Sequence, residues 1–363
     1  MTRGLSMIRW NNFPRVVDVT QMDNVWATLH TALFLVQLEE DTYDRLYIIK
    51  KIIFSSFSEF ILSDINSGTK NTIKKLDSEM YEAVYSKAYR YFLKYDMPDT
   101  LKLDYEDIIF WETKSREDML IYAAKKYVWY TEALPNARIF PEMYEIYMQE
   151  MDTELNMLSE KLSSLHELRN NQKYQKYLSH IYRLSFSMRW NQYNRNTPIS
   201  VMSHTVIVVY LSYIISMLDP DTSDTLVLEM LLRSLYHDVP EVITGDIISP
   251  TKKAVVWFAD LLEKVESHML EEYLFEYIDA DYKETLKPYL LEPFHWMIWE
   301  KVKYADIFSA YLEAKIELHY SQVFTLKEEY LRTLVQAMKH PWVEYLLREV
   351  LFEFEKSQDD SII

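Results

Sequence analysis

Apolar side chains recur every three or four positions along most of this chain, which is the spacing that one face of an α-helix produces. The pattern predicts helices at 172–188, 203–218, 224–237, 254–277, 293–318 and 326–356, with a loop at 238–253. The most apolar run has only about a dozen residues and contains Tyr and Ser, so it predicts a buried helix rather than a membrane span.

Composition also favours an all-α fold. The chain has only three glycines, whereas β-sandwiches and barrels need regular turn residues. Hydrophobic residues make up 49% and charged residues 26%, as in an ordinary globular protein, and 363 residues suggest two domains. Residues 1–10 lack the apolar core of a secretory signal, so the expected location is cytoplasmic.

Charge and cysteine content narrow the chemistry further. A net charge of −17 argues against binding to a nucleic acid polymer, which needs clustered Lys and Arg. It leaves room for a small phosphorylated substrate held by one or two local cations. The chain contains no cysteine, so any metal site must rely mainly on His, Asp and Glu.

Self-comparison indicates an internal duplication. Three pairs of segments match in the same order and at a nearly constant offset: 8–15 (IRWNNFPR) with 188–195 (MRWNQYNR), 59–70 with 241–252, and 122–124 with 304–306. We therefore predict two tandem helical domains, at 1–165 and 170–363. The join lies near 163–173, a polar stretch suited to a linker or a helix end. Because no low-complexity segment separates the copies, we expect them to pack closely.

Four side chains of the second copy could together bind a divalent metal ion. His204, the adjacent pair His237 and Asp238, and Asp306 come from three helical segments, and a helical bundle can bring such groups together in its core. A metal held there would lower the pKa of a bound water and neutralise phosphoryl charge. The alternatives are an ordinary hydrogen-bonded core histidine and, for Asp306, a buried salt bridge.

The residues around the His-Asp pair have a more specific order. Residues 235–252 read LYHDVPEVITGDIISPTK, with Glu three residues after the Asp, then Thr-Gly-Asp, a Pro and a Lys. An Arg-Trp pair precedes His204, and Lys303-Tyr-Ala-Asp306 follows. In these motifs, and over nearly all of 174–320, the second copy resembles the HD-domain 5′-nucleotidases of bacteria and archaea, the deoxyribonucleoside monophosphate phosphatases.

The resemblance implies a metal centre and a group beside it. His204, His237, Asp238 and Asp306 would bind the ion, and the family suggests manganese, cobalt or a similar metal. Glu241 would sit beside the bound water or the leaving oxygen, as an acid/base or positioning group. Its position four residues after His237 allows it to share a helical face with the ligands. The alternative for Glu241 is a solvated charge at a helix end.

The resemblance also implies substrate contacts. Asp246 would contact the substrate or hold the loop, Arg189 and Trp190 would line the sugar and phosphate pocket, and Lys252 would reach a phosphate. The alternatives are turn chemistry for Asp246, a helix terminus for the Arg-Trp pair, and an exposed lysine. Ser203 departs from the family, which usually has Glu there. That position lies near the sugar in the family, so the departure bears on substrate preference.

The first copy has lost most of the ligand set. By the repeat, Ser55 and Ser56 align with the His-Asp pair and Ala124 aligns with the last ligand. Without gaps, Asn24 aligns with the first ligand, whereas a shift of six residues places His30 there. We therefore predict that the first copy binds no catalytic metal.

Two roles for the first copy stay open. Members of the family are commonly homodimers, so the two halves would imitate that dimer within one chain, with or without further homo-oligomers. Alternatively, the Arg9-Trp10 end of the first copy keeps a regulatory nucleotide site.

The expected function is hydrolysis of a 5′-(deoxy)nucleoside monophosphate to nucleoside and phosphate by a metal-activated water. One alternative is an HD phosphohydrolase acting on a nucleoside triphosphate, a cyclic nucleotide or an alarmone, although those usually carry extra basic residues. The other is a non-catalytic nucleotide-binding regulator. No membrane partner is expected.

Overall fold

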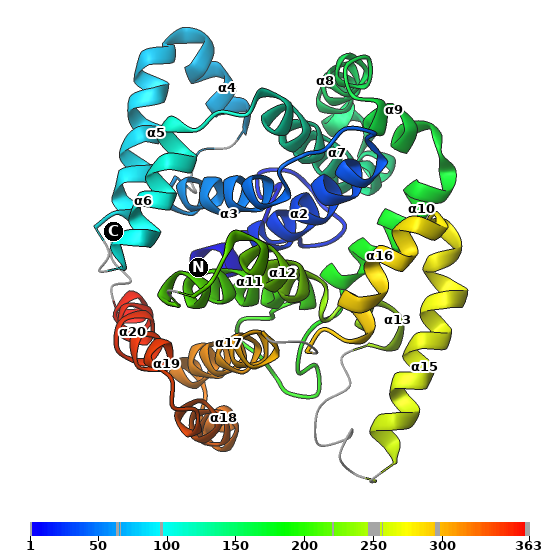
Figure 1. The fold of residues 1–363 in the computed structure, drawn as a ribbon. Helices are drawn as coiled ribbons and strands as arrows, with labels where there is room; N and C mark the ends of the chain where they lie inside the picture. The colour runs from blue at the N-terminus through cyan, green and yellow to red at the C-terminus, as the bar shows by residue number, and fades with distance from the viewer. Residues whose placement is uncertain are drawn as a thin grey trace.

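The regular structure of this protein is helical, apart from two isolated β-bridges in the part of the chain that is described. The computed structural model describes residues 2–62, 65, 67–94, 97–219, 221–245, 255, 257–294 and 298–359. Within these residues the all-α prediction is confirmed (Figure 1), and no helix is both long and apolar enough to cross a membrane.

The first half of the chain is drawn from blue to green in Figure 1. Its elements are α1 (Thr2–Ser6), α2 (Gln21–Leu38), α3 (Arg45–Ile61), α4 (Ser67–Leu76), α5 (Ser78–Phe92), α6 (Asp99–Glu106), the π-helical turn η1 (Asp107–Trp111), α7 (Ser115–Ile139), α8 (Pro141–Ser159) and α9 (Ser163–Asn170).

The second half runs from green to red. Its elements are α10 (Gln172–Ile181), η2 (Tyr182–Ser185), α11 (Val201–Leu218), α12 (Asp224–Tyr236), α13 (Glu241–Thr244), α15 (Phe258–Tyr273), η3 (Phe275–Tyr277), α16 (Ala280–Leu291), α17 (Trp299–Tyr320), η4 (Gln322–Phe324), α18 (Thr325–Ala337), α19 (Pro341–Tyr345), η5 (Leu346–Val350) and α20 (Leu351–Asp359).

The two halves repeat the same order of helices. α2 and α11 each have 18 residues, and each begins after a hydroxyl N-cap, Thr20 or Ser200, that accepts a hydrogen bond from the backbone N–H three residues later. This ungapped register pairs position 20 with position 200. α3 and α12 follow next, and later α7 corresponds to α17.

The turn before each of these helices is also repeated. An isolated antiparallel bridge joins Ile8 to Thr20 in the first half and Met188 to Ser200 in the second. Two residues after the first residue of each bridge a tryptophan has a positive φ, 57° at position 10 and 54° at position 190. A bulky side chain seldom adopts this conformation, at a cost of about 1–3 kcal/mol, so its recurrence at equivalent positions shows that both halves fold this turn in the same way.

This register corrects one alignment of the sequence. Asn24 is the counterpart of His204, and the six-residue shift that placed His30 there is wrong. The ring of His30 is fully buried, stacks on Trp26 at 5.1 Å and meets Tyr236 of the second half edge-on at 5.5 Å. Burial lowers the pKa of His30 to about 3, so the ring is a neutral packing group between the halves.

The two halves pack on each other through one continuous hydrophobic core. In the centre of the molecule α2 lies against α11 and α3 against α12 (Figure 1). Across this contact the indole Nε1 of Trp26 donates to the carbonyl oxygen of Leu235 at 3.3 Å, and the hydroxyls of Ser56 and Tyr210 are 2.6 Å apart. The close packing expected for the halves is therefore present.

A buried carboxylate sits at the same contact. Asp23 accepts hydrogen bonds from the hydroxyls of Ser200 and Ser203 in the second half, the latter at 2.9 Å. Burial raises the pKa of Asp23. Asp23 is the counterpart of Ser203 in the shared register, and two carboxylates facing each other here would repel. Ser203 is 1% exposed and bonded to the first half, and its bearing on sugar preference stays a prediction.

The join between the halves is helical. The stretch expected as a linker or helix end forms the whole of α9 and the start of α10, and Leu165 and Leu168 are fully buried in the shared core. Because the core runs through both halves, the limits 1–165 and 170–363 stay a prediction.

The predicted helices at 203–218 and 224–237 agree with α11 and α12. The prediction of a single helix over 326–356 is wrong. Helix α18 ends at Ala337, and a new helix, α19, begins at Pro341, because proline cannot continue a preceding helix. α16 was not predicted, and its sequence contains an internal proline, Pro288.

We expect Trp26→Ala to destabilise both halves together. Removing this fully buried indole should lower the free energy of unfolding by about 3–5 kcal/mol. Urea unfolding followed by circular dichroism and fluorescence should show one coincident transition at a lower midpoint. The control Trp111→Ala, at a side chain 76% exposed, should change stability by less than about 0.5 kcal/mol. Two separate transitions, with only one shifted, would contradict the shared core.

Candidate metal centre

His204 lies near the start of α11 and is fully buried. Its Nδ1 is 2.7 Å from Oε1 of Glu313 on α17, and because a carboxylate can only accept, Nδ1 carries the proton. Its Nε2 lies 3.2 Å from Oδ1 of Asp306 and 3.6 Å from Oδ2 of Asp238. The Glu313 contact therefore leaves Nε2 facing two carboxylates.

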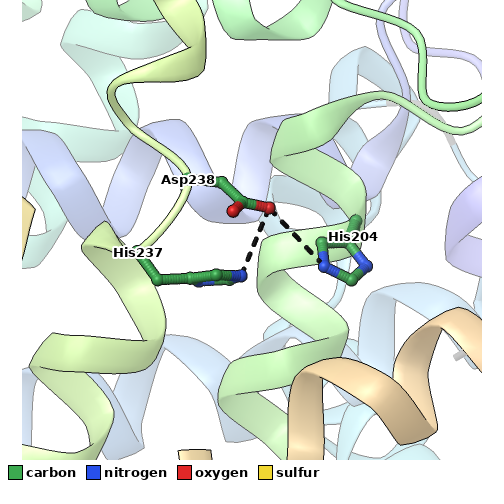
Figure 2. A group of neighbouring side chains, drawn as sticks. All are labelled: His204, His237 and Asp238. Atoms are coloured by element: carbon green, nitrogen blue, oxygen red, sulfur yellow. Dashed lines mark ion pairs between the residues drawn. The ribbon is translucent and has the colours of Figure 1, made fainter. Parts of the chain in front are cut away.

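His237 directly follows α12 and repeats this arrangement. Its Nδ1 lies 2.7 Å from the carbonyl oxygen of Ser234, which makes Nδ1 the donor. Its buried Nε2 makes no hydrogen bond to the described part of the chain and lies 3.2 Å from Oδ2 of Asp238. Figure 2 shows both imidazoles turned toward the carboxylate of Asp238.

The geometry brings together the four side chains that the sequence singled out. One ligand atom each from His204, His237 and Asp238 lies within 4.8 Å of the other two. Asp306 joins the group through its contact with His204. That these four groups bind a metal is an inference from this geometry.

Positive groups around the two carboxylates keep them ionised. Burial alone would raise the pKa of Asp238, but the adjacent His237 and the guanidinium of Arg189 hold it below its usual range. Burial acts in the same direction on Asp306, and the ammonium of Lys303, 2.8 Å from Oδ2, brings its pKa well below the ordinary value. Both aspartates are therefore charged at neutral pH.

This donor set fits a divalent cation. Each imidazole has its Nδ1 hydrogen-bonded to an acceptor, which is how metal-binding histidines are usually oriented. A buried Nε2 without a hydrogen bond, as in His237, is costly unless a ligand occupies the space beside it. Burial and Arg189 lower the pKa of His204, yet Glu313 and Asp306 raise it overall, so the space between these groups attracts positive charge.

A layer of buried charges lies behind His204. Glu313 has no exposed side-chain surface and faces Nε of Arg189 at 3.4 Å and Nη1 of Arg195 at 3.8 Å. Burial would raise the pKa of Glu313, but Arg189 and His204 lower it to about 2. Arg195 also pairs with Glu317 at 3.1 Å. Glu317 accepts two further hydrogen bonds, from the backbone N–H groups of Asn196 and Thr197, which directly follow Arg195. Each buried charge therefore faces an opposite one.

The sequence reasoning missed this layer. Glu313 and Glu317 are carboxylates inside the helix that carries Asp306, and Glu313 follows Asp306 by two helical turns on the same face. That spacing was the signal that could have found Glu313. Arg195 ends the repeated motif at 188–195, but its pairing with Glu313 depends on the path of an irregular turn, which the pattern does not predict.

The remaining predicted site residues are only partly placed. Arg189 is buried beside Asp238, with Nη1 3.4 Å from Oδ2, so it reaches the centre as expected. Trp190 is 5% exposed, packs near Phe324 and has the ammonium of Lys327 above its ring at 3.5 Å. The Trp190 indole is therefore mostly enclosed by the protein.

Glu241 is the first residue of α13, and its backbone N–H donates to the carbonyl oxygen of Asp238 at 3.1 Å. The described contacts do not link its carboxylate to the two imidazoles, so its role stays a prediction. Asp246 and Lys252 lie outside the described residues.

The first half has the same charged layer without the ligands. Asn24, at the position of His204, donates to Oε1 of Glu132 at 2.7 Å. Arg9, at the position of Arg189, donates to the other oxygen of the same carboxylate at 2.7 Å. Glu132 thus accepts hydrogen bonds from Asn24 and Arg9. In the second half Glu313 occupies the same place, where it contacts His204 and faces Arg189.

This equivalence corrects a second alignment. Glu132 on α7 corresponds to Glu313 on α17, and the residues seven positions earlier are Lys125 and Asp306. The sequence placed Ala124 opposite Asp306 because a Tyr-Ala pair precedes each, and that register is wrong by one residue. An ammonium group therefore replaces the last predicted ligand in the first half.

Comparison with known proteins matches this chain twice to one family. Residues 2–167 and 176–354 both match the family described as 5′-deoxynucleotidase YfbR-like, which confirms the tandem. A 5′-deoxynucleotidase from Vibrio parahaemolyticus is 29% identical over 188 residues, 51% of this chain and 96% of that protein. A 4′-phosphooxetanocin A phosphatase from Priestia megaterium is 30% identical over 144 residues, 38% of this chain and 71% of that protein.

We expect Glu313→Gln to weaken Mn²⁺ binding about 10–100-fold, because the neutral amide holds the Nδ1–H of His204 less strongly and removes the negative charge that faces Nε of Arg189. Calorimetric titration of metal-free protein measures the change. Glu300→Gln, on an exposed carboxylate of the same helix, is the control and should bind as wild type does. Equal affinities for Glu313→Gln and wild type would refute an orienting role.

Proposed function

This chain belongs to the family of YfbR-like 5′-deoxynucleotidases, and we propose that it hydrolyses 5′-(deoxy)nucleoside monophosphates to nucleoside and phosphate. The proposed site lies in the second half, with His204, His237, Asp238 and Asp306 holding one divalent metal ion. The relatives named as 5′-deoxynucleotidases and as a phosphatase support a phosphomonoesterase of the HD type.

One observation carries the assignment of the site. The Nε2 atoms of His204 and His237 converge on Oδ2 of Asp238, and the Nδ1 atom of each ring is already hydrogen-bonded to an acceptor (Figure 2). In His237 the Nε2 atom has no hydrogen bond to the described part of the chain, whereas a structural histidine would normally use its second nitrogen in one. Two buried imidazoles that face the same carboxylate in this way favour a cation between them.

A bound divalent metal ion supplies charge neutralisation and lowers the pKa of a coordinated water. The protein side chains do the rest. Arg189, beside Asp238, supplies a guanidinium next to the proposed ligands. Lys303 is half-exposed, pairs with Asp306 and lies above the ring of Phe294 at 4.3 Å, so it can offer an ammonium to a phosphate at the edge of the site.

The other sequence-derived roles remain part of the proposal. Glu241 would act as acid/base or position the water, Asp246 would contact the substrate or hold the loop, and Trp190 and Lys252 would contact the substrate. Manganese or cobalt is proposed because mixed imidazole and carboxylate sets suit such ions, although the ligands alone do not choose between them. A cytoplasmic location and further homo-oligomers also stay predictions.

We propose that the first half serves as the dimer-like partner of the second. Support comes from the shared core and from the hydrogen bonds of Asp23 to the second half. The loss of ligands supports a non-catalytic role, since Asn24 and Lys125 stand where His204 and Asp306 stand in the second half.

We expect Asp238→Asn to reduce phosphate release by at least about 10³-fold, because it removes the carboxylate on which both imidazoles converge. The assay measures kcat/KM in Mn²⁺-reconstituted protein with a panel of ribo- and deoxyribonucleoside monophosphates, a nucleoside triphosphate and a cyclic nucleotide. Chelation should abolish the wild-type activity and Mn²⁺ should restore it.

Asp260→Asn, on an exposed carboxylate of α15, is the matched control and should keep wild-type activity. If only the nucleoside triphosphate or the cyclic nucleotide is hydrolysed, the proposal that nucleoside monophosphates are the substrates is wrong. Monophosphate hydrolysis that survives in Asp238→Asn would refute the site.

A further inference from the structure

The first half contains a large cavity where its own metal centre would have been. The cavity has a volume of about 1130 Å³ and is lined by helices α3, α4, α5 and α7 together with the Arg9-Trp10 turn. Arg9 and Lys125, which line it, are the counterparts of Arg189 and Asp306 of the second half. A small-molecule site typically needs about 300–1,000 Å³, so there is room for a nucleotide.

The lining is basic although the chain as a whole is acidic. Five cationic side chains and two carboxylates line the cavity, in a chain whose net charge is −17. Arg9 is neutralised by Glu132, and Lys126 by Glu154. Lys70 and Lys125 form no ion pair with any residue in the described part of the chain, so their charges are available to a ligand.

These two lysines line the same cavity. Burial lowers the pKa of Lys70, the carboxylate of Glu59 raises it in part, and the charges of Arg9 and Lys125 lower it further. Glu59 is itself hydrogen-bonded to Gln21. An anion between the two ammonium groups would relieve both the desolvation of Lys70 and its repulsion by Lys125.

One wall of the same cavity is aromatic. Tyr81, Tyr85 and Tyr89 follow one another at four-residue spacing along α5, so they share a face of that helix. Their rings form a row with centroid separations of 4.5 and 6.5 Å, and Phe110 closes the row at 6.0 Å from Tyr89. Lys70 lies at this row, with Nζ 5.7 Å from the centre of the Tyr85 ring. A flat heterocycle can stack on such a wall while its phosphate meets the lysines.

We propose that this cavity is a second ligand site, which binds a nucleoside monophosphate without a metal ion. The ammonium groups of Lys70 and Lys125 bind the phosphate, and the tyrosine row of α5 contacts the base. A cation at the position of Asp306 takes over the charge that a metal would supply in the second half. The site holds its ligand without hydrolysing it, because Asn24 and Ser55 offer no metal ligand set that could activate water. This inference does not rest on the proposed activity of the second half.

The test is calorimetric titration of the full chain with dAMP in EDTA and in the Asp238→Asn background, which removes metal-dependent binding at the other site. One dAMP per chain is expected. The double variant Lys70→Gln/Lys125→Gln should weaken binding at least about tenfold, because two charged phosphate contacts are lost. Lys75→Gln, on an exposed lysine of the same helix as Lys70 that does not line the cavity, is the matched control and should bind as the parent does.

Further ligands and variants decide between the outcomes. Orthophosphate and deoxyadenosine, each carrying half of the recognised chemistry, should each bind more weakly than dAMP. If the double variant is misfolded by circular dichroism, each single variant is expected to show a weakened affinity, and Lys125→Arg should retain binding. The proposal is overturned if the parent protein binds no dAMP in EDTA, if the lysine variants bind it unchanged, or if orthophosphate binds as tightly as dAMP.

Discussion

A carboxylate at the same place in both halves, fully buried in the second half and largely buried in the first, is the constraint on which the site depends. Glu313 in the second half and Glu132 in the first each face the arginine that directly follows the first residue of the β-bridge in their half. A buried carboxylate is costly unless it is paired and hydrogen-bonded, so the arginine and the polar side chain on α2 or α11 have to stay near it. In the second half that polar side chain is His204, and the same contact that satisfies Glu313 turns Nε2 of His204 toward Asp238 and Asp306.

Within this common frame the two halves differ in a few side chains. Histidine is replaced by Asn24, which still donates to Glu132, and an aspartate is replaced by Lys125. The paired carboxylate and arginine are therefore present in both halves, whereas the side chains at the ligand positions differ. The contact between the halves also departs from symmetry: Asp23 accepts from hydroxyls where its counterpart Ser203 donates, and this avoids two facing carboxylates. A single chain with two copies permits such asymmetry, whereas identical subunits would not.

Much of this was predictable from sequence, for identifiable reasons. Helical periodicity gave the all-α class, and the repeated motifs gave the tandem, because both depend on local pattern. His204, His237, Asp238 and Asp306 stood out by residue type and order, and they do meet. The alignments that placed His30 opposite His204 and Ala124 opposite Asp306 were wrong. Shifting an alignment by a few residues changes the number of matched residues little, but it changes which side chain takes the position of a metal ligand. Glu313 and Arg195 were missed because their importance arises only from long-range pairing across helices.

The most direct test of the central claim is a crystal structure of the Mn²⁺-loaded protein with anomalous data collected at the manganese edge. The account predicts one strong anomalous peak per chain, bound by Nε2 of His204 and His237 and by the carboxylates of Asp238 and Asp306, with no peak in the first half beside Asn24 and Lys125. A peak of similar height in the first half, or a manganese ion held elsewhere with the four side chains of the second half unliganded, would contradict it.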